Sequence, residues 1–171
     1  EREAPGMPGH YDHRYFYTEI GYNLKHTDPQ AAVGLAQLEK LPHFVTRRRE
    51  NFAFLYEALA PFSEYLSLPT WHDKADPSWF AMPLLVRDEA PFSRYELTRY
   101  LEEHNVETRP LFAGNILKQP AYQGLACRVI GDLPIADQIM RGVFFIGVYP
   151  GLDNQRLNYM VDVIQSFVSE L

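Results

Sequence analysis

From about residue 63 to the C-terminus, the sequence alternates between short apolar runs of strand length and helices that carry their own start signals. Strand candidates occupy residues 65–68, 79–87, 106–111 and 144–148. Ser93 and Glu96 have the spacing of a capping box, and Asp153 is a candidate N-cap for the last helix. That helix has a regular apolar stripe of Leu157, Met160, Val161, Ile164, Phe167 and Val168. Strands that alternate with helices predict a sheet layered with helices, an α/β or α+β fold.

The first 62 residues are mainly helical. Thr27 and Gln30 form another capping-box pattern, so a helix is expected from about residue 27 to 40. A second helix is expected over residues 43–59, with the three arginines at 47–49 on a solvated face. We therefore expect residues 1–62 to form a loop and connecting helices, and residues 63–171 to form a small α/β domain.

Composition narrows the class of protein. The chain has 171 residues, about one domain, and 46% hydrophobic residues are enough for a core. A net charge of −6 argues against a nucleic-acid partner, and no apolar run approaches the roughly 18 residues of a membrane span, so we expect neither partner. The single Cys127 excludes an internal disulfide and a metal or cluster site made only of this chain's cysteines. Low cysteine content suits a reducing compartment, and we expect a cytoplasmic protein.

No residue is a strong candidate for catalysis or for metal binding. His10 and His13 lie three positions apart around Asp12, but no third ligand accompanies them. The sequence has no nucleophile elbow, no P-loop and no dinucleotide-binding fingerprint. We expect no catalytic residue and no metal ligand within this chain.

A polar turn before the first helix is one candidate binding site. Asn23 and Lys25 lie between Gly21 and the predicted cap at Thr27. An amide and an ammonium group beside a helix N-terminus can receive an anion. The alternative interpretation is an ordinary capped helix.

The loop after the strand candidate at 106–111 is a second candidate site, because strand ends that lead into loops often carry ligand-binding groups. Arg109 could grip a phosphate or carboxylate, and Phe112 could stack on a ring. Gly114 allows a close backbone approach, and Asn115 can both donate and accept hydrogen bonds. The alternative is a structural loop in which Arg109 pairs with an acidic neighbour.

These motifs together resemble one family. The segments at 17–25, 27–32 and 34–38 are similar to the sugar aminotransferase family called DegT/DnrJ/EryC1/StrS. Four further segments resemble its branch of CDP-4-keto-6-deoxyglucose 3-dehydrases, the RfbH-like lipopolysaccharide proteins; these segments are 109–115, 119–122, 129–134 and 145–151. The resemblance extends from about residue 11 onward.

The resemblance implies the C-terminal small domain of a pyridoxal-phosphate (PLP) fold-type I enzyme, preceded by connecting helices. It also implies that the full-length parent uses pyridoxamine or pyridoxal phosphate and an iron–sulfur cluster. This chain alone is expected to hold neither, because the anchoring Lys or His and the cluster cysteines of the family precede the matched segment. Asn23 and Lys25 match positions that contact the cofactor phosphate, typically across a dimer interface. Arg109, Phe112, Gly114 and Asn115 match the substrate-facing loop.

The resemblance thus implies a C-terminal fragment of a pyridoxamine-phosphate-dependent sugar-nucleotide 3-dehydrase of deoxysugar and lipopolysaccharide biosynthesis. The start at Glu1 without Met fits a fragment, a processed chain or a trimmed chain. We expect a sugar-nucleotide substrate, a homodimer, a separate reductase for the parent, and no activity from this chain alone. One alternative is a fragment of a PLP-dependent sugar aminotransferase, whose parent would carry Lys at the anchoring position. Another is a non-catalytic dimerisation or binding domain.

Overall fold

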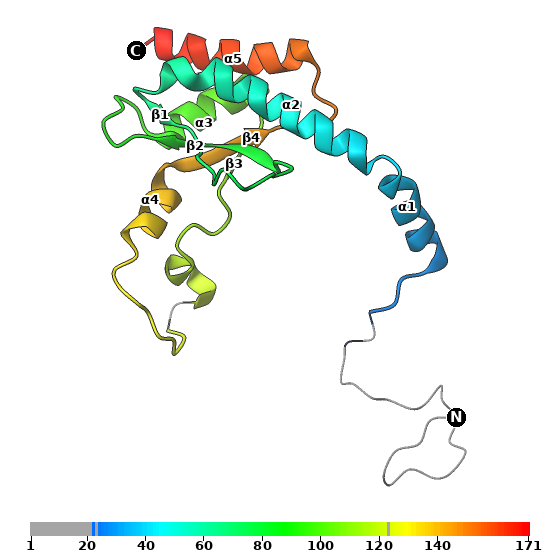
Figure 1. Cartoon of the computed structure of the whole chain (residues 1–171). Helices are drawn as coiled ribbons and strands as arrows, with labels where there is room; N and C mark the ends of the chain where they lie inside the picture. The colour runs from blue at the N-terminus through cyan, green and yellow to red at the C-terminus, as the bar shows by residue number, and fades with distance from the viewer. Residues whose placement is uncertain (1–21, 23, 123) are drawn as a thin grey trace, which may run out of the picture. The chain divides into compact units, whose positions relative to one another are not determined.

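The computed structural model of the chain describes residues 22, 24–122 and 124–171 (Figure 1). The chain divides into two compact units, residues 1–39 and residues 40–171, and each is described by itself. In the described part of the chain, no helix is long and apolar enough to cross a membrane.

The described part of the first unit contains helix α1, Asp28–Leu38. The predicted capping pattern is present, because the Thr27 N–H donates to Gln30 Oε1 at 2.9 Å. Pro29 lies in the first turn, where its missing N–H leaves no hydrogen bond unmade. None of the helix residues is buried.

The second unit begins with the long helix α2, Leu41–Leu59, followed by the short 3-10 helix η2, Ala60–Phe62. Phe52, Leu55 and Leu59 of α2 are buried and belong to the same hydrophobic core as the sheet. The structure therefore groups α2 with the sheet, whereas the sequence pattern predicts it among the connecting helices. The reason is the apolar face of α2, which is covered by the strands and helices of residues 63–171.

A four-stranded antiparallel sheet lies at the centre of this unit, with strand order β1-β2-β4-β3. Its strands are β1 Leu66–Ser67, β2 Ala81–Val86, β3 Thr108–Pro110 and β4 Val143–Gly147. Pro83 lies within β2, but the two-residue β1 pairs only with Leu85 and Val86. The missing N–H of Pro83 therefore faces no strand partner on that side, which agrees with the edge-like position that its presence predicts.

Three helices cover one face of the sheet: α2, α3 (Arg94–Glu103) and α5 (Asn154–Ser169) (Figure 1). The predicted caps of α3 and α5 form, since Ser93 and Asp153 accept from the backbone N–H groups of Glu96 and Arg156. Alternate strand residues point into this helical layer. They form the core with the helices, as Met82, Leu84, Phe144 and Ile146 show.

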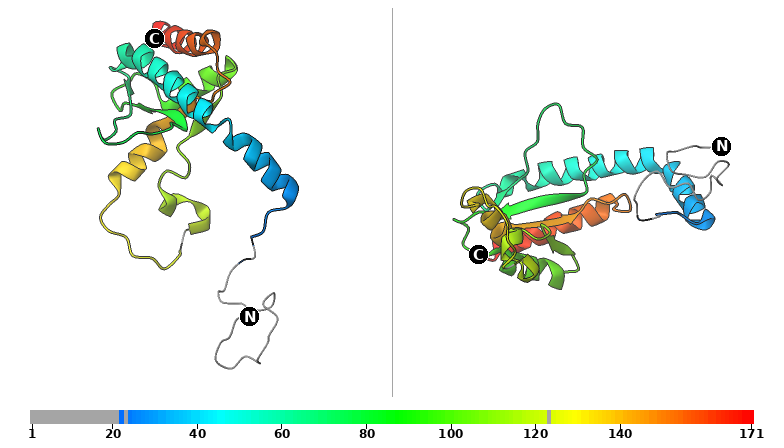
Figure 2. Two further views of the ribbon diagram at one scale, coloured as in Figure 1. Left: turned by 45° about the vertical axis from the view of Figure 1, so that its right-hand side comes forward. Right: turned by 90° about the horizontal axis from the view of Figure 1, so that it is seen from below.

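The opposite face of the sheet, here called the outer face, carries Pro83, Phe145 and Arg109 in one row across three strands. Helix α4, Pro134–Gly142, lies at the end of this face beside β2 and β4 (Figure 1). The segment between β3 and α4 contains two short 3-10 helices, Ile116–Lys118 and Pro120–Tyr122. It extends away from the sheet in Figure 1 and in the left view of Figure 2, as a loop predicted between these elements would.

Candidate functional site

Three phenylalanines gather on the outer face and form what we call the aromatic surface: Phe80, Phe112 and Phe145. The three rings form a triangle, with centroids 5.7 Å apart for Phe80 and Phe145, 6.1 Å for Phe112 and Phe145, and 6.3 Å for Phe80 and Phe112. Phe80 is 66% exposed and Phe112 is 75% exposed. Large apolar side chains exposed next to one another indicate a contact surface for a ligand or for another part of a protein.

The backbone of Phe112 is strained. Its φ of 47° lies in the left-handed region, which costs a non-glycine residue about 1–2 kcal/mol. The strand ends at Pro110, whose carbonyl accepts from the Phe112 N–H at 2.7 Å, and this tight turn directs Phe112 toward Phe145. Strain at an exposed aromatic residue is a feature of binding sites.

Arg109 lies opposite Phe145 in the β3–β4 ladder and so points to the same face. Its guanidinium pairs with Glu107, which was the alternative that the sequence left open. Both side chains of this pair are well exposed, so the ion pair contributes little and leaves the guanidinium accessible to an anionic ligand. Arg109 and Phe112 are thus the two predicted residues that the structure brings together, through Phe145.

Gly114 makes its close approach to helix α4. Its φ is +60°, and a Cβ at this position would lie 2.6 Å from Met140 Cβ. Only glycine fits there without moving either segment. The glycine therefore allows the loop to pack on α4 within the chain.

Asn115 is only 5% exposed, and both ends of its side-chain amide are used inside the loop. Its Nδ2 donates to Asp137 Oδ1 at 2.6 Å, and its Oδ1 accepts from the Leu117 N–H at 3.1 Å. Lys118 Nζ lies 2.8 Å from the second carboxylate oxygen of Asp137. The hydrogen bonds from Lys118 and then Asn115 hold the pKa of the Asp137 carboxyl below its usual value. This geometry favours a positioning role for Asn115, which ties the loop to α4.

The three arginines at 47–49 act differently from the solvated face that the sequence predicted. Each guanidinium donates to backbone carbonyls of loops that are distant in sequence. Arg48 Nη1 donates to the backbone carbonyl oxygens of Trp79, at 3.1 Å, and Phe80, at 3.0 Å. These hydrogen bonds fix the backbone at Phe80. The basic run was visible in the sequence, but nothing in its spacing indicated which carbonyls it would bind.

The first predicted site lies in the other unit. Lys25 is exposed in the turn before α1, and Asn23 lies outside the described residues. Within the described part of the chain, no group of three or more His, Cys, Asp or Glu residues could hold a metal ion. Cys127 is exposed and unpaired there.

Comparisons with known proteins agree on one family. The profile of the DegT/DnrJ/EryC1/StrS aminotransferase family matches residues 3–165. The chain is 45% identical over 166 residues to the lipopolysaccharide biosynthesis protein RfbH of Salmonella typhimurium. The alignment covers 97% of this chain and 38% of RfbH. It is 40% identical to the dTDP-4-dehydro-2,6-dideoxy-D-glucose 3-dehydratase of Saccharopolyspora spinosa, covering 96% of this chain and 35% of the relative. The chain thus spans little more than a third of these relatives.

Solved structures share the fold. An aminotransferase from Psychrobacter cryohalolentis matches with a TM-score of 0.82 at 22% identity, over 99% of this chain and 44% of that one. The E. coli GDP-4-keto-6-deoxy-D-mannose-3-dehydratase with bound hydrated PLP matches with a TM-score of 0.78 at 23% identity, over 88% of this chain and 38% of that one. These likenesses confirm the predicted fold class, which is that of a portion of the PLP fold-type I architecture. The chain belongs to the DegT/DnrJ/EryC1/StrS aminotransferase family.

Proposed function

We propose that this chain is the C-terminal part of a sugar-nucleotide 3-dehydrase of deoxysugar and lipopolysaccharide biosynthesis. The observation that carries the proposal is the order of the similarities. RfbH and a dTDP-4-dehydro-2,6-dideoxy-D-glucose 3-dehydratase are 45% and 40% identical to the chain. Two GDP-4-keto-6-deoxy-D-mannose 3-dehydratases and a GDP-perosamine synthase are each 31% identical, and a dTDP-4-amino-4,6-dideoxy-D-glucose transaminase is 25% identical. The predicted substrate is a keto-sugar nucleotide, and the predicted assembly is a homodimer served by a separate reductase.

The first unit is the proposed contact for the phosphate end of pyridoxamine phosphate. The Thr27 N–H is already used by Gln30, so an anion at this turn would be held by side chains, and the exposed Lys25 ammonium is suited to this. Asn23 is the proposed second contact. When bound in the parent, the cofactor supplies the amine and the electron sink for removal of the 3-hydroxyl.

The residues of this chain do not fit an iron–sulfur cluster. Such clusters are held mainly by cysteine thiolates, and the sequence has only Cys127. The predicted cluster of the parent therefore concerns sequence outside this chain, and no step of the reaction is assigned to it here.

The outer face is the proposed contact surface for the substrate. The aromatic surface can pack against the apolar face of a hexose ring, and Arg109 can bind a phosphate oxygen once it exchanges its exposed partner Glu107. Arg48 fixes the position of Phe80, and Gly114 and Asn115 hold the loop that carries Phe112. These residues bind and orient; none of them is proposed to move a proton.

The test uses the full-length parent encoded by the reading frame that contains this sequence. Incubated with pyridoxamine phosphate and CDP-, dTDP- or GDP-linked 4-keto-6-deoxyhexoses, it should release water from the sugar, as detected by mass spectrometry. The parent should also carry His at the anchoring position. A product that keeps its 3-hydroxyl and gains a 4-amino group would show an aminotransferase instead and would overturn the proposal.

A second test addresses the cofactor contact. Asn23→Ala and Lys25→Ala in the parent should each weaken cofactor retention by about 1.5–3 kcal/mol, the value of a hydrogen bond to a charged group. The rate on fully bound cofactor should change little, since contact with the phosphate is the same throughout the reaction. Lys74→Ala, in an exposed loop of the other unit, is the matched control. Equal retention in the Lys25 and Lys74 variants would remove Lys25 from the site.

A further inference from the structure

A groove of about 470 Å³ lies beside the aromatic surface, between the start of β3, the end of β4 and the first turns of α5. Its floor is apolar and comprises the buried side chains of Val106, Leu152 and Met160. The rings of Phe145, Tyr149 and Tyr159 also line it. This size and this lining are typical of a small-molecule site.

Two glycines leave room for the ring of Tyr149. A Cβ at Gly147 would lie 3.3 Å from Tyr149 Cδ1, and a Cβ at Gly151 would lie 3.0 Å from Tyr149 Cε2. Side chains at these positions would therefore press on the ring from both ends of the turn. About half of Tyr149 remains exposed, so the ring is accessible from the groove.

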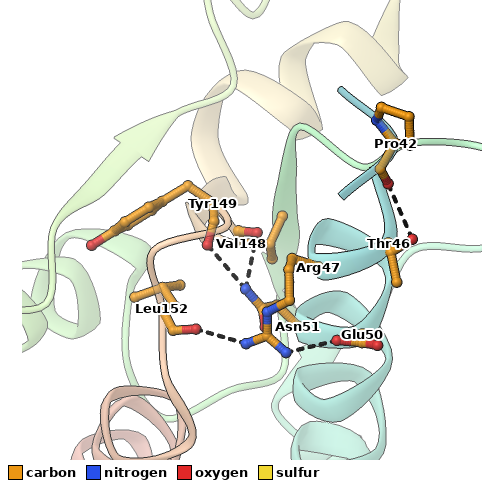
Figure 3. Close-up of polar contacts among 8 residues, drawn as sticks. All are labelled: Pro42, Thr46, Arg47, Glu50, Asn51, Val148, Tyr149 and Leu152. Carbon is orange, nitrogen blue, oxygen red and sulfur yellow. Dashed lines mark hydrogen bonds and ion pairs between the residues drawn. The ribbon is translucent and has the colours of Figure 1, made fainter. Parts of the chain in front are cut away.

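Two side chains of α2 hold the backbone of the same turn (Figure 3). Asn51 Nδ2 donates hydrogen bonds to the backbone carbonyl oxygen of Tyr149, at 2.9 Å, and to that of Val148, at 3.3 Å. Arg47 Nη2 lies 2.9 Å from the Leu152 oxygen, and Arg47 Nη1 pairs with Glu50 at 2.6 Å. Asn51 is 1% exposed, and its Oδ1 has no hydrogen-bond partner among the described residues, so burying it costs free energy. The two hydrogen bonds from Asn51 Nδ2 fix the backbone of the turn that carries Tyr149.

Two arginines lie at the rim of the groove. Arg109 pairs with Glu107, and Arg156 pairs with Asp153 at 2.5 Å. Both pairs are exposed, so each guanidinium can exchange its carboxylate for a phosphate at little cost. Phosphate suits the planar fork of arginine, which binds two of its oxygens at once.

We propose that this groove is the subsite for the nucleoside diphosphate part of the sugar nucleotide, an inference that rests on the proposed function. The base lies among Tyr149, Tyr159 and the apolar floor, because every base has a face that stacks on an aromatic ring. The diphosphate lies at Arg109 and Arg156. Phe145 belongs to both the groove and the aromatic surface, so the attached hexose reaches that surface directly. Asn51 and Arg47 are positioning residues for Tyr149.

The experiment titrates the 171-residue chain with CDP, dTDP, GDP and UDP, and separately with the matching nucleosides and with inorganic pyrophosphate, followed by calorimetry. At least one nucleoside diphosphate should bind saturably with a Kd below about 1 mM, and more tightly than its nucleoside or pyrophosphate. Arg156→Gln should weaken the diphosphate about ten- to a hundredfold and leave the nucleoside unchanged. Arg128→Gln, at an exposed loop position outside the groove, is the control.

The positioning role has its own readout. Tyr149→Ala should weaken both diphosphate and nucleoside, and Asn51→Ala should weaken them less than tenfold on its own. With Tyr149 already replaced, the Asn51 change should have no further effect on binding, because Asn51 acts through that ring. If Tyr149→Ala unfolds, the Arg156 and Arg128 comparison still decides the assignment of the groove.

Absence of saturable binding by all four nucleotides would overturn the inference, and so would equal affinities for the Arg156 and Arg128 variants. In the parent, Arg156→Gln should raise KM and leave kcat unchanged, and an unchanged KM would also overturn it. These failures are distinguishable from failure of the proposed function, which is decided by the product formed and needs no groove variant.

Discussion

Helices α1 and α2 follow one another in the chain, but the apolar side chains of α1 are exposed and several of those of α2 are buried. Helix α1 is rich in apolar residues, yet Val33, Leu35 and Leu38 are all more than half exposed. Helix α2 carries three consecutive arginines, yet it contributes Phe52 and Leu55 to the core. Apolar content alone therefore does not decide which helix is buried.

The largest expected effect separates a leucine of each helix. Leu55 of α2 is fully buried, whereas Leu35 of α1 is 65% exposed. Leu55→Ala should lower the free energy of unfolding by about 2–5 kcal/mol, since it leaves a cavity in the core. Leu35→Ala should change it by no more than about 0.5 kcal/mol. Urea denaturation of the two variants measures both values, and similar losses would mean that α1 is packed within this chain.

The next largest effect compares Gly114 and Gly124, two glycines in the segment between β3 and α4. Gly114→Ala requires a left-handed φ, at about 1–2 kcal/mol, and pushes a Cβ into Met140, at about 1–3 kcal/mol. Gly124→Ala meets the same backbone strain, with φ +80°, but no atom lies within 4 Å of its Cβ among the described residues. The difference between the two variants in urea denaturation isolates the packing of the loop on α4. If the two midpoints coincide, the loop is not packed there in solution.

A third glycine tests α1 directly. Gly34 lies inside the helix, and no atom of the described residues lies within 4 Å of its Cβ position. Gly34→Ala should therefore raise helix content, detected by circular dichroism, and stabilise α1 by about 0.5–1 kcal/mol. In the full-length parent the same change should weaken assembly if α1 packs closely on another surface. Unchanged assembly, measured by ultracentrifugation, would argue against a close contact at this position.

The smallest expected effect is a loss of stability at low pH in the loop that Asp137 holds. The pKa of Asp137 is lowered in the folded chain, chiefly by hydrogen bonds from Lys118 and Asn115. A lowered folded pKa stabilises above the unfolded pKa, and this contribution is lost as pH falls through the folded value, below about pH 4. The loop of residues 111–133 should therefore become more sensitive to an acid-active protease below that pH. Asp137→Asn should remove this pH dependence, while Asp88→Asn in a surface turn should keep it.

Local patterns predicted the helix starts well. The capping boxes at Thr27 and Ser93 and the cap at Asp153 are all present, because each needs only residues three positions apart. The stripe of α5 likewise placed Leu157 and Ile164 in the core. Contacts between distant segments were not predictable in this way. Arg48 holds the carbonyl of Phe80, 32 positions away, and no local spacing encodes that contact.

The candidate site likewise has features that local sequence patterns predict and features that depend on contacts between distant segments. The sequence by itself indicated that the stretch from Arg109 to Asn115 follows a strand and carries an arginine and an aromatic residue, and the resemblance to one family followed from such local motifs. Only the tertiary structure decided that Phe80 and Phe145 join Phe112, and that Gly114 and Asn115 serve the contact with α4. The physical reason is that caps and amphipathic stripes are interactions between near neighbours in the chain. Burial and cross-strand pairing depend on which distant segments meet, which the pattern of any one segment leaves open.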